Sequence, residues 1–458
     1  MPPLSNAHTR DIETLIHPYT NLDAHRSDGP LVLDSGDGIY VRDTEGRQYI
    51  EGMAGLWCTS LGYGNEELIE AAKDQLSRLS FTHLFGGKSH DPAIALAEKL
   101  KEISPAPASK IFFTCSGSEA NDTQIKLAWY YNNARGLTRK KKIISRQRAY
   151  HGVTIASASL TGLPANHADF DLPIEGILHI ACPYYYRNAK PGESEESFST
   201  RLANELDELI QKEDPDTIAA FIAEPVMGAG GVIVPPEGYF AKIQAVLAKY
   251  DILFIADEVI CGFGRTGNLF GSETFDLKPD TISVAKAITS AYAPLGAVTV
   301  PEDVYQAMLD ESRKIGTFGH GFTYTGHPLS TAIGLKTLEI YERDDIVAHV
   351  RSVASAFQSR LKALSSHPLV GDARGVGLLG AIELVADKSS RTPFDPKQGA
   401  AAHAAQMCQE EGLIVRPIFG DALALCPPLI ITEQQVNEMF DVLERGLERS
   451  MDLLKAAA

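Results

Sequence analysis

The 458-residue sequence has no excess of basic residues, because 59 aspartates and glutamates outnumber 42 lysines and arginines and give a formal net charge of -17. A nucleic-acid partner would require a basic surface that displaces counterions, so we expect none. The sequence also lacks a run of eighteen apolar residues, and its first residues lack the charged and apolar regions of a signal peptide. We therefore expect a soluble, cytoplasmic protein with no membrane partner.

Cysteine is also scarce, with six residues and no C-x-x-C pair. This pattern predicts neither a disulfide framework nor a zinc site, and we expect no metal. No internal repeat or low-complexity segment is present. The composition, 44% hydrophobic and 22% charged, is ordinary for a globular enzyme, and the length suffices for one large and one small domain.

Two short apolar runs, residues 252–256 and 281–285, each end in a charged residue. Runs of this kind predict strands that are buried on both faces of a sheet. Asp257 follows the first run, and Lys286 follows the second. Because ligands of open α/β sheets bind beyond the carboxyl ends of the strands, we expect both side chains to face one crevice.

A lysine and an aspartate placed in this way suit pyridoxal phosphate. That cofactor needs an amine for its Schiff base and a carboxylate that keeps its pyridine nitrogen protonated. Lysine is suitable because its pKa falls readily on burial. Alone, the lysine could extend from a strand end into solvent and the aspartate could cap a turn; their joint placement favours the cofactor.

A formal G-x-G-x-x-G motif, G-F-G-R-T-G, occupies residues 262–267 and raises the alternative of a nicotinamide-dependent oxidoreductase. A dinucleotide site requires this motif to join a strand directly to a helix. Here several residues separate it from the preceding strand, and residues 268–278 show no helical period. We therefore predict a tight loop.

A predicted strand at residues 110–114 runs into C-S-G-S-E-A-N-D and then a helix. Free backbone N–H groups, hydroxyl donors and the positive end of a helix form an anion site. This pattern predicts that Ser116, Gly117 and Ser118 hold the cofactor phosphate. A capping box would explain the serine and glutamate equally well.

Five further positions are candidates for the site. Tyr150 follows a predicted strand and could stack on a planar ring, and we rank it above its neighbour His151. Trp57 lies in a glycine-rich stretch and could form a pocket wall, although a lone tryptophan is more often part of the core. Arg416 ends a strand and could grip a substrate carboxylate, with Arg374 as the alternative.

Alternation of strands and helices through the middle of the chain predicts a mostly parallel sheet with helices on both faces. The polar residues 1–30 predict an extended arm, and residues 31–50 a small antiparallel unit. Further strands are expected near 371–384, 413–416 and 422–425, and a final helix at 432–454. We expect three parts: an arm with part of a small domain (1–60), a large cofactor-binding domain (61–328) and a C-terminal small domain (329–458).

Together these residues resemble the class III aminotransferases, the ω-aminotransferase branch of fold-type I pyridoxal-phosphate enzymes. The resemblance extends from about residue 36 to the C-terminal helix. Its motifs are S-G-S-E-A (116–120), Y-H-G (150–152), A-E-P (223–225), D-E-V-I-C-G-F-G-R-T-G (257–267), A-K (285–286) and G-F-T-Y-T-G-H-P (321–328). The resemblance implies an aspartate aminotransferase-like α/β fold, with a mostly parallel seven-stranded sheet in the large domain and a smaller α+β domain.

The resemblance also implies roles for particular residues. Lys286 would form the Schiff base and carry the proton, and Asp257 would bind the pyridine nitrogen. Family members are homodimers with shared sites, so Phe322 and Thr323 would act across the subunit interface. The implied cofactor-binding residues are Ser116, Gly117, Ser118, Tyr150, His151, Glu224, Asp257, Val259, Lys286, Phe322 and Thr323. The implied substrate-binding residues are Leu22, Trp57, Phe85, Tyr150, Ala229 and Arg416.

Two departures narrow the expected activity. Many class III members have glutamine where this chain has Ile260, and 4-aminobutyrate-type members have glutamate where it has Ala229. Without that glutamate, we expect Arg416 to swing aside when an apolar amine enters. The sequence looks most like amine:pyruvate aminotransferases, which move an amino group from a primary amine or ω-amino acid to pyruvate or another 2-oxo acid. An aminomutase or decarboxylase with the same cofactor is the alternative.

Overall fold

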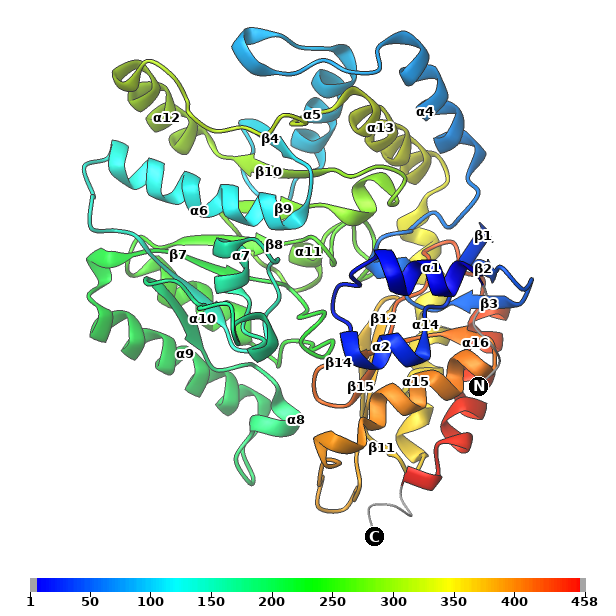
Figure 1. The fold of residues 1–458 in the computed structure, drawn as a ribbon. Coiled ribbons are helices and arrows are strands. Elements are labelled where there is room, and N and C mark those ends of the chain that lie inside the picture. Colours follow the sequence, from blue (N-terminus) through cyan, green and yellow to red (C-terminus); the bar gives the residue numbers. More distant parts are fainter. Residues whose placement is uncertain (1–5, 454–458) are drawn as a thin grey trace.

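A seven-stranded sheet carries the two predicted charged residues at its strand ends. In the computed structural model, which describes residues 6–453, the strand order of this sheet is β4-β10-β9-β8-β7-β5-β6 (Figure 1). Strand β10 pairs antiparallel with both β4 and β9, and the other pairs are parallel, so the predicted mostly parallel sheet is confirmed. The strands are β4 (Lys110–Thr114), β5 (Lys142–Arg146), β6 (Ile177–Ile180), β7 (Ile218–Ala223), β8 (Leu253–Asp257), β9 (Thr281–Val284) and β10 (Gly296–Val300).

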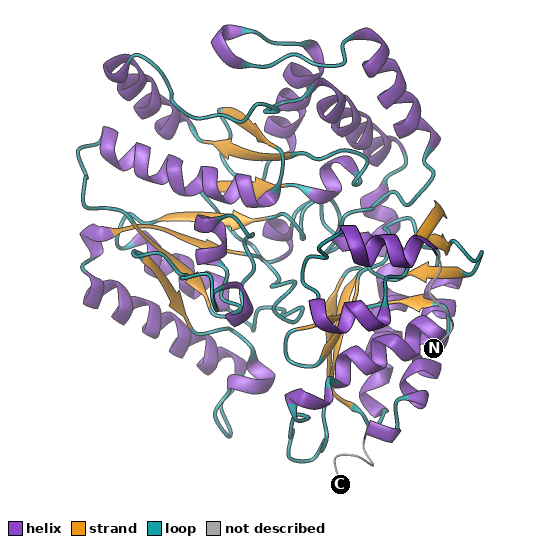
Figure 2. Ribbon diagram, viewed as in Figure 1, coloured by secondary structure: helices purple, strands orange, loops and turns teal. Residues whose placement is uncertain are grey.

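Helices cover both faces of this sheet (Figure 2). Every residue of β7 is buried, and alternate residues point to opposite faces. Ala220 and Ile222 belong to a hydrophobic cluster with Ile125 of α6 (Gly117–Ala134). Phe221 belongs instead to the main core, with Phe198 of α9 (Glu195–Glu213) and residues of α10 (Tyr239–Ala248). A strand covered on both sides must be apolar throughout, which explains the continuous runs in the sequence.

The remaining helices beside this sheet are α4 (Glu66–Arg78), α5 (Asp91–Ile103), α7 (Ile155–Leu160), α8 (Tyr185–Asn188), α11 (Gly271–Thr274), α12 (Glu302–Ile315) and α13 (Pro328–Arg343), with the short helix α3 (Ala54–Trp57) before them. Helix α4 and strands β6 and β10 were not among the predicted elements. No helix within residues 6–453 has the length and apolar character needed to cross a lipid bilayer.

Two further sheets have four strands each, and the first of them joins the beginning of the chain to its C-terminal part. The first has the order β1-β2-β3-β13, and the second β11-β12-β15-β14. Strand β3 pairs in parallel with β13, which ties the predicted antiparallel unit to the C-terminal part of the chain. The strands are β1 (Leu33–Asp37), β2 (Tyr40–Asp43), β3 (Gln48–Glu51), β11 (Val370–Val376), β12 (Leu379–Leu384), β13 (Leu413–Ile414), β14 (Arg416–Ile418) and β15 (Ala422–Leu425), and the helices nearby are α14 (Ile346–Ala363), α15 (Ala400–Glu410) and α16 (Glu433–Arg449).

The N-terminal arm is helical rather than extended, so this prediction was wrong. It contains α1 (Asn6–Thr14) and α2 (Leu22–Asp28), while residues 1–5 of the predicted arm lie outside the described residues. Helix α2 forms because the Asn21 side chain accepts hydrogen bonds from two backbone N–H groups of its first turn. Gly29 ends it with φ +70°, a conformation that glycine adopts easily. The polar composition of the arm therefore reflects two helices without buried residues, of which α2 is capped at both ends.

Candidate active site

Lys286 and Asp257 line the same cavity, of about 110 Å³. Asp257 is the last residue of β8, and Lys286 follows the end of β9, the neighbouring strand. The structure therefore brings together the two side chains that the sequence placed at one crevice. The full lining consists of Gly117, Ser118, Asn121, Tyr150, His151, Gly152, Glu224, Asp257, Val259, Ile260 and Lys286.

The Asp257 carboxylate is held by three hydrogen bonds. Its Oδ2 atom accepts one from Asn121 Nδ2 at 2.8 Å, and His151 Nδ1 lies at the same distance from it. Its Oδ1 atom accepts the backbone N–H of Val259 at 3.1 Å. Only 3% of Asp257 is exposed. Because hydrogen bonds to a carboxylate favour its charged form, the arrangement suits a carboxylate that holds a protonated ring nitrogen.

Lys286 combines burial with an unusual backbone. Its φ angle is +52°, in the left-handed region, and it begins a short turn of 3-10 helix (Lys286–Thr289). Burial lowers its pKa, against the opposing influence of the Asp257 charge. The Nζ atom lies 5.8 Å from the centre of the Trp57 ring. A lysine whose pKa is lowered has more of the neutral amine that acts as a nucleophile.

Glu224 and Tyr150 form another wall of the cavity. Burial raises the pKa of Glu224 to about 7, although His151 and Arg146 act in the opposite direction. Its Oε2 atom lies 3.7 Å from Arg146 Nη2. The Tyr150 ring meets the ring of Tyr19, which lies in the arm, edge-on at 6.4 Å between centres. The arm thus reaches a residue that lines the cavity.

The N-terminus of α6 forms the end of the cavity where the phosphate was predicted. Gly117 and Ser118 line it, and the Ser118 hydroxyl accepts the backbone N–H of Val153 at 3.1 Å. The Ser116 hydroxyl accepts the backbone N–H of Glu119 and so caps the helix, which is one half of the capping box offered as the alternative. The Glu119 carboxylate accepts the backbone N–H of Cys115. A Cβ at Gly117 would lie 3.1 Å from a methyl of Val259, a tight contact that a larger residue could make only if Val259 shifted. The first turn therefore offers free N–H groups to an anion.

Two of the predicted substrate residues, Arg416 and Ala229, lie next to a third, Trp57. Arg416 lies over Trp57, with its guanidinium carbon 4.9 Å from the ring centre, and Ala229 packs in the same hydrophobic cluster as Trp57 and Ile260. Arg374 donates to the carbonyl of Gly231 at 2.8 Å and pairs with neighbouring carboxylates. Within residues 6–453, no carboxylate forms an ion pair with Arg416. Arg416 is therefore the arginine that can receive a substrate carboxylate.

Eight predicted residues do not line this cavity. Four of them are described above (Ser116, Trp57, Ala229 and Arg416), and the other four are Leu22, Phe85, Phe322 and Thr323. Leu22 is the first residue of α2 and is half exposed. Phe85 lies against Gly321, so that a Cβ on this glycine would meet its ring. Phe322 and Thr323 follow in the same loop, where Thr323 is exposed. The structure therefore gathers Phe85 with this loop, outside the cavity lining.

The glycine motif at 262–267 does not form a dinucleotide site. Its residues lie in turns, and the next helix, α11, has only four residues. Within the motif, Arg265 is buried and donates hydrogen bonds to the carbonyls of Leu378 and Pro427. The motif thus anchors a tight loop, as predicted.

Asn121 is the main site residue that the sequence analysis missed. It binds Asp257, and its amide also donates to the backbone carbonyl of His151 at 2.7 Å. The sequence could have predicted that Asn121 belongs to the site, because it lies three residues after Ser118 and therefore on the same face of the helix. Asn121 Oδ1 and His151 Nε2 are buried without a hydrogen-bond partner among the described residues. These polar atoms beside the cavity are suited to a polar ligand.

A lysine and an aspartate at neighbouring strand ends, facing a helix N-terminus, define a pyridoxal-phosphate enzyme of fold type I. The Aminotransferase class-III family model matches residues 23–447, and the chain belongs to this family. It is 52% identical over 411 residues, 90% of this chain and 79% of the other, to gamma aminobutyrate transaminase 3, chloroplastic, from Solanum lycopersicum.

Solved structures agree with this assignment. The omega transaminase from Pseudomonas jessenii in complex with PMP has a TM-score of 0.97 and 51% identity, covering 99% of this chain and all of that one. A transaminase with L-ala has a TM-score of 0.91 and 56% identity, covering 93% of this chain and 100% of that one. The predicted fold class, enzyme class and cofactor, pyridoxal 5'-phosphate, are confirmed.

Proposed function

We propose that this aminotransferase moves an amino group from a primary amine or ω-amino acid to pyruvate, giving alanine. The observation that carries the proposal is Arg416, which lies over Trp57 without a carboxylate partner among the described residues. Trp57 in turn belongs to an apolar cluster with Ala229 and Ile260. A guanidinium binds the carboxylate of pyruvate strongly, and the apolar wall accepts the uncharged part of an amine.

The relatives support both halves of this proposal. Several similar proteins are named gamma-aminobutyrate transaminases, which points to an ω-amino acid as donor. A similar transaminase was solved with L-ala, the product expected from pyruvate. An omega transaminase changed at a tryptophan, a phenylalanine and an arginine was engineered for bulky amines, and these are the residue types of Trp57, Phe85 and Arg416.

In this account each residue has a defined task. Bound pyridoxal phosphate supplies the carbonyl that takes up the amino group and a ring that withdraws electrons. Burial lowers the pKa of Lys286, so its Nζ atom would act as the base that takes the proton from the substrate carbon and would then donate it to the cofactor carbon. The hydrogen bonds from Asn121, His151 and the Val259 N–H fix the orientation of the Asp257 carboxylate, which would hold the protonated ring nitrogen.

We propose further that a second copy of the chain completes the site. Phe85, Phe322 and Thr323 lie outside the cavity of their own chain, and Thr323 is exposed. In a homodimer, the loop with Phe322 and Thr323 would supply Thr323 to the phosphate of the other copy, and the adjacent Phe85 would enter its substrate pocket. Size measurements in solution test this arrangement: a strictly monomeric active enzyme contradicts it.

A screen of amine donors with pyruvate tests the function. We expect alanine to form in amounts equal to the pyruvate consumed, with 4-aminobutyrate and apolar primary amines among the donors. An aminomutase or decarboxylase would consume no pyruvate. The variant Lys286→Ala is the control, because any alanine that it forms cannot depend on the proposed site.

A further inference from the structure

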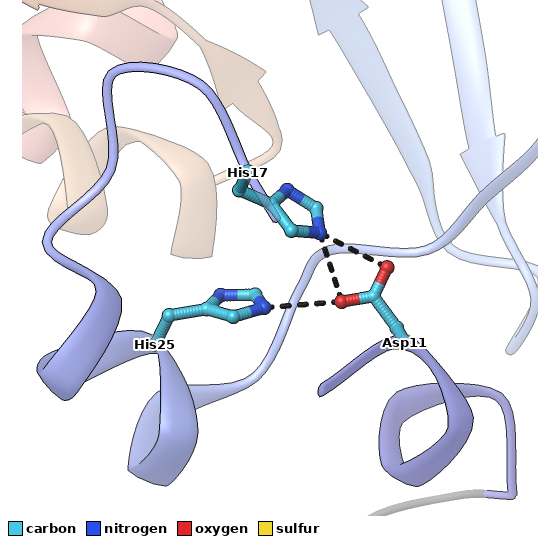
Figure 3. A group of neighbouring side chains, drawn as sticks. All are labelled: Asp11, His17 and His25. Atoms are coloured by element: carbon cyan, nitrogen blue, oxygen red, sulfur yellow. Dashed lines mark hydrogen bonds and ion pairs between the residues drawn. The ribbon is translucent and has the colours of Figure 1, made fainter. Parts of the chain in front are cut away.

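Three potential metal ligands meet in the N-terminal arm, and none of them is among the residues assigned to the cofactor. Figure 3 shows Asp11 of α1, His17 of the following loop and His25 of α2 pointing toward one another. His17 Nε2 lies 2.8 and 3.0 Å from the two carboxylate oxygens, and His25 Nε2 lies 3.0 Å from Oδ1. We call these three residues the arm cluster.

The arm cluster is enclosed but reachable by solvent. The exposed fractions of the side chains are 15% for Asp11, 30% for His17 and 10% for His25. The two imidazole rings lie with their centres 4.3 Å apart and a tilt of 38°. Both carboxylate oxygens of Asp11 face imidazole nitrogens, since His17 Nε2 lies near Oδ1 and Oδ2 and His25 Nε2 lies near Oδ1. The three side chains therefore already point toward the position that an ion would take.

We infer that the arm cluster binds a divalent transition metal, Zn²⁺ in the first place, through His17 Nε2, His25 Nε2 and one oxygen of Asp11. Two imidazoles and one carboxylate form a well-suited donor set for this ion, and water can fill the remaining position. Ligands of a tetrahedral Zn²⁺ ion lie about 3.4 Å apart. The nitrogen–oxygen separations of 2.8 to 3.0 Å therefore need to open by about half an ångström.

The position of the arm cluster gives the metal a structural task. Asp11 and His25 flank the turn that carries Tyr19, and His17 lies within the same segment. The Tyr19 hydroxyl accepts a hydrogen bond from Asn166 Nδ2 at 2.6 Å, and its ring meets Tyr150 of the active site. A metal joining α1, the loop and α2 would hold Tyr19 against Tyr150. The inference does not depend on the proposed amino donor.

Metal titration of the tag-free, chelator-treated holoenzyme tests the inference. We compare the wild type with His17→Gln/His25→Gln, and with His403→Gln as a matched control, because His403 is also partly exposed and lies 3.4 Å from a carboxylate of Asp452. We expect one Zn²⁺ site per chain in the wild type and the control. Loss of two ligands should weaken that site more than about 100-fold in the double variant.

Two further measurements separate the arm cluster from other metal-binding groups. Co²⁺ bound by nitrogen and oxygen gives visible absorption bands, whereas Co²⁺ bound by cysteine also gives a thiolate charge-transfer band. We expect the visible bands without the charge-transfer band. Zn²⁺ should also slow proteolysis of the 15–21 segment in the wild type only. Equal Zn²⁺ affinity and stoichiometry in the wild type and the double variant would overturn the inference, as would a wild type that binds no Zn²⁺.

The cofactor absorbance and the melting temperature show whether the variants are folded. If the double variant does not fold, His25→Gln alone replaces it, since this change removes one ligand on the exposed helix α2. The single variant should still lose Zn²⁺ affinity by at least about tenfold. An unchanged affinity in His25→Gln likewise overturns the inference.

Discussion

His151 Nδ1 lies 2.8 Å from Oδ2 of Asp257, and at most 3% of either residue is exposed. An ionised carboxylate accepts hydrogen bonds only, so Nδ1 carries a proton and donates it to this contact. The contact fixes the carboxylate orientation on one side, while Asn121 fixes it on the other. His151 is thus a positioning residue for Asp257, a stronger role than its rank in the sequence analysis indicated.

Replacing His151 with phenylalanine should lower kcat while the fold is kept. The change removes one hydrogen bond to a buried charge, which is worth about 1.5–3 kcal/mol. If this energy stabilises the transition state, its loss lowers the rate roughly 10- to 100-fold. Steady-state kinetics at saturating cofactor measure it. Asn121→Ala, which removes the other donor to the same oxygen, should act in the same direction; normal kcat in both variants contradicts the role.

Replacing Arg416 with methionine should separate the two kinds of substrate. The loss of a charge-assisted hydrogen bond should raise KM for pyruvate by roughly 10- to 100-fold. The half-reaction with an amine that has no carboxylate should change little, since such a donor does not use the guanidinium. Single-turnover spectra of each half-reaction measure the difference.

Arg374→Lys is the control for this variant. Arg374 donates a hydrogen bond to the carbonyl of Gly231 and pairs with neighbouring carboxylates. Arg374→Lys should therefore lower the free energy of unfolding, without a selective rise in KM for pyruvate. A uniform effect of Arg416→Met on both half-reactions would argue against carboxylate binding by Arg416.

Glu224 should make the protein less stable as the pH rises. Its pKa is raised by burial from 4.5 to about 7, so the folded state binds the proton more tightly than the unfolded state. The resulting stability is fully present below pH 4.5 and is lost as the pH rises through about 7. Glu224→Gln removes this dependence, which amounts to at most about 3 kcal/mol. Urea unfolding across this range measures the slope, and an equal slope in wild type and variant refutes the assignment.

Gly228 and Ile260 should be coupled. A Cβ at Gly228 would overlap Cδ1 of Ile260, which is buried. Gly228→Ala should therefore cost about 1–3 kcal/mol of unfolding free energy through overpacking. Ile260→Val removes the overlapping methyl, so the double variant should be more stable than the sum of the two single changes predicts. Strict additivity in a thermal or urea double-mutant cycle contradicts the contact.

The sequence predicted the parts of the site that depend on strand ends. The apolar runs before Asp257 and Lys286 have the length and composition of buried strands, and neighbouring parallel strands place their carboxyl ends at one edge of the sheet. Strand β10 was missed because G-A-V-T-V is short, and nothing local shows that it enters the sheet antiparallel between β4 and β9. Pairing between distant segments is set by the whole fold.

The arm shows what local reasoning could and could not find. Asn21 and Gly29 are ordinary helix-capping residues, so α2 was readable from the sequence. The meeting of Asp11, His17 and His25 was not, because it depends on how the loop after α1 reverses the chain. The same holds for Phe85, whose place beside Gly321 depends on segments more than two hundred residues apart.

The most direct test of the account is the identity of the residue joined to the cofactor. Borohydride reduction of the purified holoenzyme makes the link between pyridoxal phosphate and its amine permanent, and peptide mass spectrometry then locates the pyridoxyl group. We predict that it lies on Lys286, and that Lys286→Ala carries no label and forms no alanine from pyruvate. A label on another lysine of the wild type, or full transamination by Lys286→Ala, would contradict the account.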